Sequence, residues 1–234
     1  MKRFDIITIF PKIINDYSKI SIIARAIKKK FIKITAHDLR DFTNDAHKTV
    51  DGRPYGGGLG MVLRADIMQK AIKKIAGKKN KKQRIILVTP QGKVFNQIEA
   101  QRLSKFERLI FVCGRYEGFD ERIGSMVDEE LSIGDYVLMG GELPALVMLE
   151  TIARFYPGVV GKFESTQSES FAKSGMQNLL EYPQYTRPEA LKMGNKIISV
   201  PKVLLSGHHK DVEEWRVAES LKRTIKRRPD LLKA

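Results

Sequence analysis

The sequence contains a single cysteine, Cys113, and no hydrophobic run long enough to cross a bilayer. One cysteine excludes disulfides within the chain and zinc sites built from cysteine clusters. The apolar stretch near the start, residues 6–10, is too short for the core of a signal peptide. We therefore expect a cytoplasmic protein, and we expect Cys113, at the end of a predicted strand, to pack in the core.

The common phosphate-loop patterns are also missing, although glycine-rich segments are frequent. Four lie close together: DGRPYGGGLGM (51–61), TPQG (89–92), CGRYEGFDE (113–121) and GDYVLMGGELP (134–144). None fits G-x-x-x-x-G-K-[ST], and none fits G-x-G-x-x-G after a strand, which argues against a P-loop or kinase-type site. Taken singly, each glycine also fits an ordinary turn.

Acidic residues are few beside the basic ones: 27 Asp and Glu against 42 Lys and Arg give a net charge of +15. This surplus points to nucleic acid or an acidic membrane face, with a lysine-rich proteome as the alternative. Residues 73–84 form a lysine-rich cluster that is interrupted by Gly77 and Asn80, as in a solvated loop. Residues 221–233 carry arginines in a helical pattern, which suits phosphate contacts better.

Three short apolar runs have the length and composition of buried strands: residues 4–10, 84–90 and 108–114. Between the last two, apolar side chains fall on one face of a predicted helix over residues 93–106: Phe95, Ile98, Leu103 and Phe106. Strand, helix and strand at this spacing predict a βαβ unit and hence a parallel sheet.

A second predicted helix, residues 144–155, begins with Pro144 and is dense in apolar side chains. We expect it to be buried, with another subunit as one possible packing partner. Arg154 ends this helix, and a buried arginine needs a partner, so it forms either a structural ion pair or a ligand contact.

The composition changes after Gly161 to a polar, serine-rich stretch that predicts a linker or loop. Further on, residues 211–225 predict a helix capped by Asp211, with Glu214 at its third position. Its expected buried stripe is Val212, Trp215, Ala218, Leu221 and Ile225. We expect an α/β domain over residues 1–160, a linker over residues 161–175 and a small basic helical domain over residues 176–234.

The loops TPQG and CGRYEG follow two predicted parallel strands, and ligands in open α/β sheets bind at the carboxyl ends of strands. Their convergence predicts a small-molecule site. Glu117 and Asp120 fit either a cationic ligand or a helix cap. His208 and His209 are adjacent and share no helical face, so we expect structure or RNA contact there and predict no metal site.

Several long motifs occur in order: RPYGGGLGM, LVTPQG, CGRYEGFDERI, SIGDYVLMGGELPA, RFYPGVVG, EYPQYTRPE and VPKVLLSGHHKDVEEWR. Over essentially the whole chain, the sequence closely resembles the bacterial tRNA (guanine-N1)-methyltransferases, the TrmD family of the SPOUT superfamily. The resemblance implies an α/β fold tied in a deep trefoil knot, a small C-terminal α-helical domain, and a homodimer with active sites at the interface.

The resemblance further implies that S-adenosylmethionine is held bent in the knot, where glycines let the backbone approach the adenine. Carried over by motif, the cofactor contacts are Pro90, Gly92, Gly114, Tyr116, Glu117, Gly118, Ser132, Ile133, Gly134, Tyr136, Leu138, Gly140, Gly141 and Pro144. Family members use Mg²⁺, although the sequence shows no separate cluster of metal ligands.

The implied reaction moves the methyl group to N1 of guanosine 37 in tRNA, which requires a base to remove the N1 proton. Glu169 matches the family base and Arg154 the arginine that stabilises charge on the guanine carbonyl oxygen. Asp51 matches an aspartate that reads the neighbouring guanosine. Arg216, Arg223 and Arg227 are expected to contact RNA.

Three positions depart from the family pattern. Glu169 replaces an aspartate, Gly52 replaces the second aspartate of a D-D-R-P-Y segment, and Leu87 stands where an aromatic residue is common. Two alternatives follow from the change at Glu169. One is an RNA-binding protein without activity, and the other is a SPOUT enzyme that modifies another RNA or a ribose hydroxyl.

Overall fold

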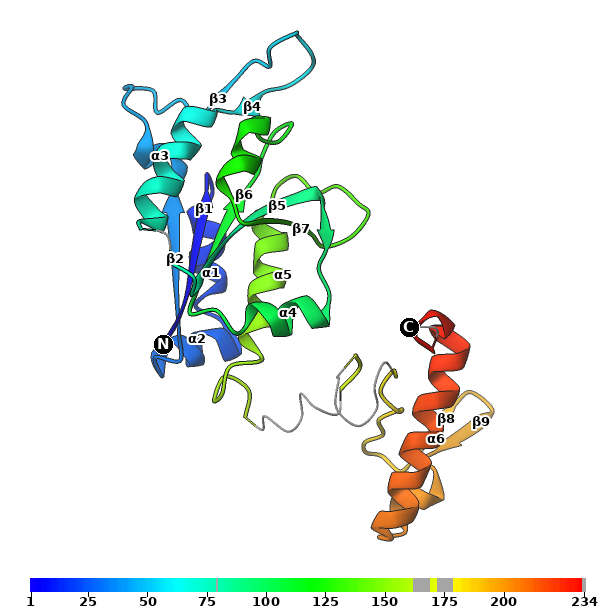
Figure 1. The fold of residues 1–234 in the computed structure, drawn as a ribbon. Coiled ribbons are helices and arrows are strands. Elements are labelled where there is room, and N and C mark those ends of the chain that lie inside the picture. The colour runs from blue at the N-terminus through cyan, green and yellow to red at the C-terminus, as the bar shows by residue number, and fades with distance from the viewer. Residues whose placement is uncertain (79, 162–168, 172–178, 233–234) are drawn as a thin grey trace. The chain divides into compact units, whose positions relative to one another are not determined.

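The structure of the protein is a computed structural model that describes residues 1–78, 80–161, 169–171 and 179–232. The chain divides into two compact units, Met1–Gly161 and Lys162–Ala234 (Figure 1). Within the described ranges, no helix combines the length and the hydropathy that crossing a membrane requires.

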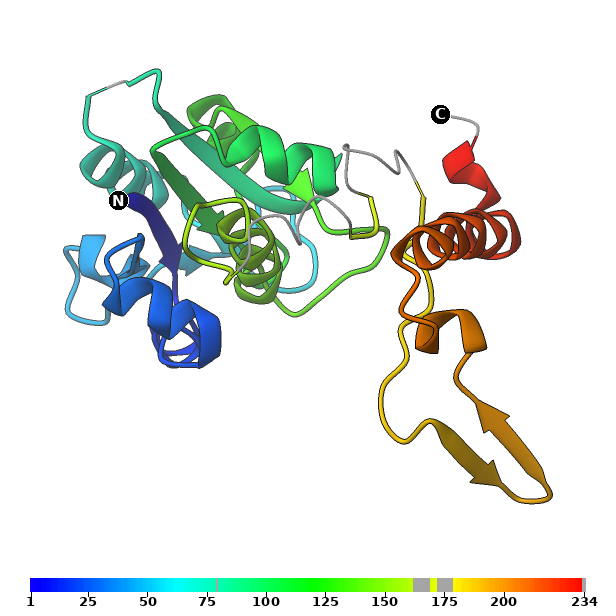
Figure 2. The ribbon, with the colours of Figure 1, turned by 90° about the horizontal axis from the view of Figure 1, so that it is seen from below.

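A five-stranded parallel sheet forms the centre of the first unit, in the order β2-β1-β6-β5-β7 (Figures 1 and 2). Its strands are β1 (Lys2–Thr8), β2 (Ile32–Asp38), β5 (Gln83–Val94), β6 (Arg108–Cys113) and β7 (Glu129–Ser132). The predicted parallel sheet is confirmed, and three of its strands coincide with the predicted apolar runs to within a few residues. Strands β2 and β7 were not predicted.

Helices cover both faces of the sheet. They are α1 (Pro11–Tyr17), α2 (Ser21–Lys28), α3 (Ala65–Ala76), α4 (Gln97–Leu103) and α5 (Glu142–Ala153). Because side chains alternate along a strand, Phe4 and Ile6 pack with α1, α2, α4 and α5, whereas Ile7 packs with α3. Two 3₁₀ turns, η1 (Leu39–Phe42) and η2 (Glu121–Met126), complete the α3 face, next to the short pair β3 (Asp51–Gly52) and β4 (Val62–Leu63).

The helix predicted over residues 93–106 is shorter than expected and forms α4. Asn96 caps it, because its side chain accepts a hydrogen bond of 3.0 Å from the backbone N–H of Glu99. Residues 93 and 94 belong instead to β5, and Ile98 is exposed rather than packed. The register shows why β5 is long: Val88 and Lys93 both pair with Leu131, so residues 89–92 arch out of the ladder.

A charged network lies inside the first unit. Asp5 on β1 is buried, and its carboxylate lies 2.7 Å from His37 Nε2 and accepts a hydrogen bond of 2.7 Å from Arg108 Nε. Burial raises the pKa of Asp5, but the hydrogen bonds from His37 and Arg108 outweigh burial and hold this pKa below its ordinary value. The network therefore stabilises the fold only while Asp5 is ionised.

Replacing Asp5 by Asn should lower the free energy of unfolding at pH 7 by about 2 kcal/mol, because Arg108 loses a charged acceptor. A carboxyl group whose pKa is lower in the folded than in the unfolded state stabilises the fold at pH values above its unfolded-state pKa. This stabilisation is lost as the pH falls through the folded-state pKa. The wild type should therefore lose stability below about pH 4, and Asp5→Asn should lose less. Urea denaturation at pH 7 and pH 3 measures this. Asp41→Asn at an exposed site is the control, and equal effects of the two substitutions would contradict the account.

The second unit is built on α6 (His209–Arg227). It also contains an unpredicted antiparallel hairpin, β8 (Ala190–Met193) and β9 (Lys196–Ser199), and the turns η4 (Lys202–Leu205) and η5 (Pro229–Leu232). Most of the predicted linker, residues 162–168 and 172–175, lies outside the described residues.

Two predictions about α6 are wrong. Its N-cap position is His208, and Asp211 lies inside the first turn. Leu221 and Ile225 of the expected buried stripe are 43% and 56% exposed, whereas Ser220 and Thr224 are buried. The reason is that the preceding segment runs along the polar side of the helix: the Leu180 N–H donates to Thr224 Oγ1 at 2.8 Å.

Candidate active site: a cavity at the carboxyl edge of the sheet

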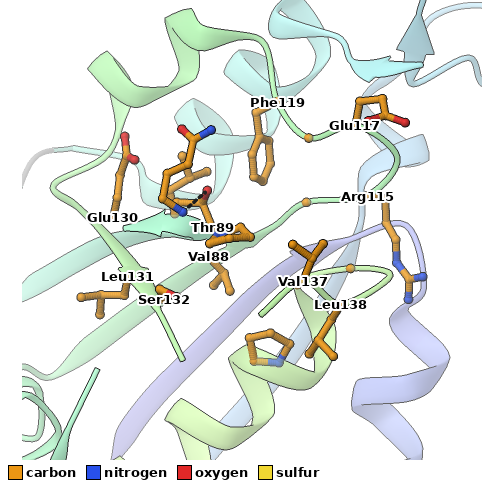
Figure 3. A pocket seen from close by; sticks show the side chains of 18 of the residues that line it. Val88, Thr89, Arg115, Glu117, Phe119, Glu130, Leu131, Ser132, Val137 and Leu138 are labelled. Atoms are coloured by element: carbon orange, nitrogen blue, oxygen red, sulfur yellow. Dashed lines mark hydrogen bonds between the residues drawn. The ribbon is translucent and has the colours of Figure 1, made fainter. Parts of the chain in front are cut away.

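A cavity of about 400 Å³ lies at the carboxyl ends of β5, β6 and β7. Its walls come from the arch of β5 and from the segments that follow β6 and β7. Figure 3 shows Phe119 and Val137 directed towards its middle, with Arg115 at its margin. The predicted convergence of the loops TPQG and CGRYEG on this edge is therefore confirmed, whereas the glycine-rich segment 51–61 contributes no residue to the cavity.

Most of the predicted cofactor contacts line this cavity: Pro90, Gly114, Tyr116, Glu117, Gly118, Ser132, Ile133, Tyr136, Leu138, Gly140, Gly141 and Pro144. Gly92 and Gly134 do not. A Cβ on Gly92 would lie 2.5 Å from the backbone of Glu130, so this glycine allows β5 to pass β7 closely. Gly134 has φ of +143°, and its N–H donates to Ser132 Oγ at 3.1 Å, so it shapes the loop behind the cavity wall.

Gly140 and Gly141, the two adjacent glycines before α5, lie directly against residues 113–115 at the end of β6. A Cβ on Gly141 would lie 2.9 Å from both Cys113 Cα and the Gly114 nitrogen, and a Cβ on Gly140 would lie 2.2 Å from Arg115 Nε. The Gly141 N–H also donates to the Gly114 carbonyl at 2.9 Å. A side chain at Gly141 would therefore require the end of β6 to move, and one at Gly140 would displace the Arg115 side chain.

A buried ion pair that sequence reasoning missed fixes this crossing. Glu142 is 1% exposed, accepts a hydrogen bond of 2.6 Å from Thr8 Oγ1 and pairs with Arg115 Nε at 2.9 Å. The Arg115 guanidinium also lies over the Phe10 ring, 4.5 Å from its centroid. Three segments distant in sequence, at β1, β6 and α5, are thus joined at one carboxylate.

The remaining charges of the cavity are mostly acidic. Glu117, Glu121 and Glu130 line it, and among its described lining residues only Arg115 is basic. Asp120 has a different role: it caps η2, and the hydrogen bond from the Arg122 side chain lowers the pKa of Asp120 to about 2. The cavity thus favours a ligand with positive charge.

Cys113 and Tyr116 lie at the end of β6 and just beyond it. Cys113 is fully buried as predicted, and burial raises the pKa of its thiol well above the ordinary value. Tyr116 lines the cavity with a left-handed backbone, φ of +59°, which is uncommon for a residue other than glycine. Such backbone strain is typical of ligand sites.

The other predicted site residues are not among those that line the cavity. Arg154 occupies the C-cap position of α5 and is half-buried, and Asp51 is half-buried on β3. Glu169 belongs to the second unit, beside Ser170, whose hydroxyl accepts a hydrogen bond of 3.0 Å from the Glu181 N–H.

The three arginines predicted to contact RNA also belong to the second unit. Arg216 lies over the Tyr182 ring at 4.9 Å, Arg223 donates to the Glu181 carbonyl at 3.2 Å, and Arg227 is exposed. In the parts of the chain that the structure describes, no group of three or more His, Cys, Asp or Glu residues is arranged to hold a metal ion.

The fold and the cavity define an α/β protein that binds a small molecule at the carboxyl edge of a parallel sheet. The family model for tRNA (Guanine-1)-methyltransferase TrmD matches residues 1–234, so the chain belongs to this enzyme family.

Three relatives, each called tRNA (guanine-N(1)-)-methyltransferase, are similar over nearly their whole length. The protein of Ruminiclostridium cellulolyticum is 48% identical (98% of this chain, 95% of the relative). That of Dictyoglomus turgidum is 47% identical (99% and 90%), and that of Mycoplasmopsis agalactiae is 48% identical (98% and 96%).

Substitution of Gly141 by Ala should weaken the binding of S-adenosylmethionine about tenfold or more, because the added methyl group must push the end of β6 away from α5. Calorimetric titration of the ligand measures this. Gly161→Ala is the matched control, since a Cβ there meets nothing within 4 Å, and it should leave the affinity unchanged. Equal affinities of the Gly141→Ala protein and the wild type would show that the crossing does not shape the binding site.

Proposed function

We propose that this protein transfers the methyl group of S-adenosylmethionine to N1 of guanosine 37 in tRNA. The observation that carries the proposal is the cavity formed by three glycine-bearing segments, in a chain that matches the TrmD family model from end to end. Bound there, S-adenosylmethionine supplies an electrophilic methyl group on a positively charged sulfur. All remaining chemistry has to come from the side chains and from the RNA.

The cavity fits this ligand in size and charge. Its volume of about 400 Å³ is in the range of small-molecule sites. Glu117, Glu121 and Glu130 complement the sulfonium and amino groups, while Leu87, Val137 and Leu138 offer apolar surface to the adenine. Leu87 keeps that surface aliphatic where relatives often have an aromatic side chain.

Glu169 is proposed as the general base. N1 of neutral guanine carries a proton, so it becomes a nucleophile only when a carboxylate removes that proton. Relative to aspartate, glutamate adds one methylene, and a displacement of about 1 Å can cost roughly a hundredfold in rate. The adjacent Ser170 hydroxyl accepts a hydrogen bond of 3.0 Å from the Glu181 N–H, which joins the turn at Glu169 to the segment before α6.

Arg154 is proposed to stabilise the negative charge that develops on the carbonyl oxygen of guanine as the proton leaves. A guanidinium placed there binds the transition state more strongly than the ground state. Arg154 and the cavity lie at opposite ends of α5, a helix of 12 residues and hence about 18 Å long. One subunit therefore cannot supply both the methyl donor site and this arginine to the same base.

This separation supports a homodimer in which Arg154 of one subunit serves the cavity of its partner. The exposed face of α5 gives further support, because Leu143 and Val147 are 57% and 48% exposed in the single chain. They lie four residues apart on one side of the helix, as expected for an apolar contact between two copies.

The second unit is proposed to bind the anticodon region of the tRNA. Arg216 stacked on Tyr182 presents a flat cation and an aromatic ring side by side, an arrangement that suits stacking on unpaired bases. Arg223 and Arg227 would contact phosphates. Asp51 would read the guanosine beside the target, since a carboxylate accepts from the N1–H and amino group of guanine.

Other features follow from the family rather than from the geometry: the deep trefoil knot, a requirement for Mg²⁺ and a location in the cytoplasm, where tRNA is modified. The close passage of Gly141 over the end of β6 and of Gly92 over β7 is the tight packing that a knotted chain would require.

Methyl transfer from labelled S-adenosylmethionine to two tRNA transcripts tests the proposal. The transcripts differ only in guanosine or adenosine at position 37. We expect label on the guanosine transcript alone, mapped to N1. Label on neither, with intact cofactor binding, would indicate a binding protein or another RNA substrate, and label on both would contradict the assigned residue roles.

Glu169→Gln should lower the single-turnover rate of methyl transfer by about a hundredfold or more, because the amide cannot accept the N1 proton. The affinities for cofactor and tRNA should stay within about twofold. Glu169→Asp is the informative companion, since it restores the residue of the family. An unchanged single-turnover rate for Glu169→Gln would exclude Glu169 as the base.

A further inference from the structure

The edge of the sheet opposite the cavity carries a dense set of lysines. Because the strands are parallel, the segments that precede them meet at this edge, which faces the viewer in Figure 2. Backbone hydrogen bonds join them in a row: the Lys2 N–H donates to the Phe31 carbonyl at 3.0 Å, and the Glu107 N–H donates to the Lys82 carbonyl at 2.8 Å. We call this surface, formed by residues 28–33, 78, 80–82 and 104–107, the lysine edge.

The charge of the lysine edge is almost entirely of one sign. Residues 28–33 and 78–82 contain eight lysines and no Asp or Glu, although the whole chain has 27 acidic residues for 42 basic ones. Every described lysine of these two segments is exposed. The acid on the third segment, Glu107, pairs with Lys82 at 2.8 Å. A lysine-rich composition alone would not separate the charges in this way, with carboxylates at the cavity and lysines at the opposite edge.

The backbone at Lys30 gives an independent reason to assign a function to this edge. Helix α2 ends in a Schellman motif, in which the Lys30 N–H donates to the Ile27 carbonyl at 2.9 Å and the Phe31 N–H to the Ala26 carbonyl at 3.0 Å. Lys30 takes the left-handed position of this motif, with φ of +59°, where glycine is normal and a residue with a side chain is strained. The chain keeps a lysine at a position where glycine would be more stable.

Helix capping does not account for these lysines. Cations near the C-terminus of a helix interact with its dipole, but this effect falls off within the last turn. Lys28 lies in the last turn of α2, whereas Lys33 lies on β2, and Lys81 and Lys82 follow α3 by several residues. The lysines therefore extend well beyond the positions at which a helix dipole could stabilise them.

We infer that the lysine edge is a second RNA-binding surface, which holds phosphates of the substrate RNA away from the reacting nucleotide. The identity of that RNA as tRNA rests on the proposed function. Exposed ammonium groups suit a phosphate backbone, which is read by charge and not by sequence. A membrane surface is disfavoured, because none of the large hydrophobic side chains that the structure leaves exposed lies in these three segments.

The test is a triple variant, Lys29→Gln, Lys30→Gly and Lys33→Gln, titrated with full-length tRNA at several salt concentrations. Its affinity should fall roughly tenfold near physiological salt, and the slope of log Kd against log salt should become shallower by about 2. Affinity for S-adenosylmethionine and the rate of methyl transfer at saturating tRNA should not change. The single variant Lys30→Gly should raise the melting temperature while it weakens RNA binding, which a purely structural lysine would not do.

The matched control removes the same charge from lysines outside the edge: Lys12→Gln, Lys19→Gln and Lys70→Gln. It should change tRNA affinity less than about twofold. Equal losses in the two triple variants, or an unchanged salt slope in the edge variant, would overturn the inference. Binding to phosphatidylserine vesicles that the edge variant loses, with tRNA binding intact, would overturn it as well. Wild-type protein that binds tRNA with the expected salt slope but does not methylate it would contradict only the proposed function.

Discussion

The backbone of Gly140 and Gly141 packs directly against the end of β6, and this crossing depends on the ion pair between Arg115 and Glu142. A carboxylate as buried as that of Glu142 is tolerated only because Thr8 and Arg115 satisfy it. The same pair fixes where α5 begins, and therefore where the wall of the cavity stands. The glycines at this position are thus a steric consequence of the crossing: the space that a Cβ would need is occupied by another segment of the chain.

Helix α5 separates two parts of the proposed active site. The helix starts at the cavity and ends at Arg154, so the site for a methyl donor and the proposed charge-stabilising arginine are about one helix length apart. We propose that an active site using both is therefore shared between two copies of the chain. The sheet separates charge along the same direction, with carboxylates at the cavity and lysines at the opposite edge. A cationic cofactor and a polyanionic RNA would thereby be attracted to different parts of one unit.

Much of the first unit could be predicted from sequence because its central strands are short apolar runs that end at glycine or proline. Strand β2 was not predicted because it is not a continuous apolar run, although its apolar and polar residues alternate as in a half-buried strand. Strand β7 was not predicted because it has only four residues. In α6 the aliphatic residues repeat with a helical period that predicts a buried stripe. The side of the helix that is actually buried carries Ser220 and Thr224, and the segment before the helix is bonded there through the Leu180 N–H and Thr224 Oγ1. Half of the residues that line the cavity were predicted by motif. The pairing of Arg115 with Glu142, 27 positions apart, is a tertiary contact that no local pattern encodes.

We propose that S-adenosylmethionine binds where the three glycine-bearing segments meet. Amide hydrogen exchange with and without S-adenosylmethionine tests it most directly, because it reports each segment separately. We expect slower exchange in residues 89–92, 114–118 and 132–141, with little change at the lysine edge and in α6. Protection confined to other segments, or none at saturating ligand, would contradict the account.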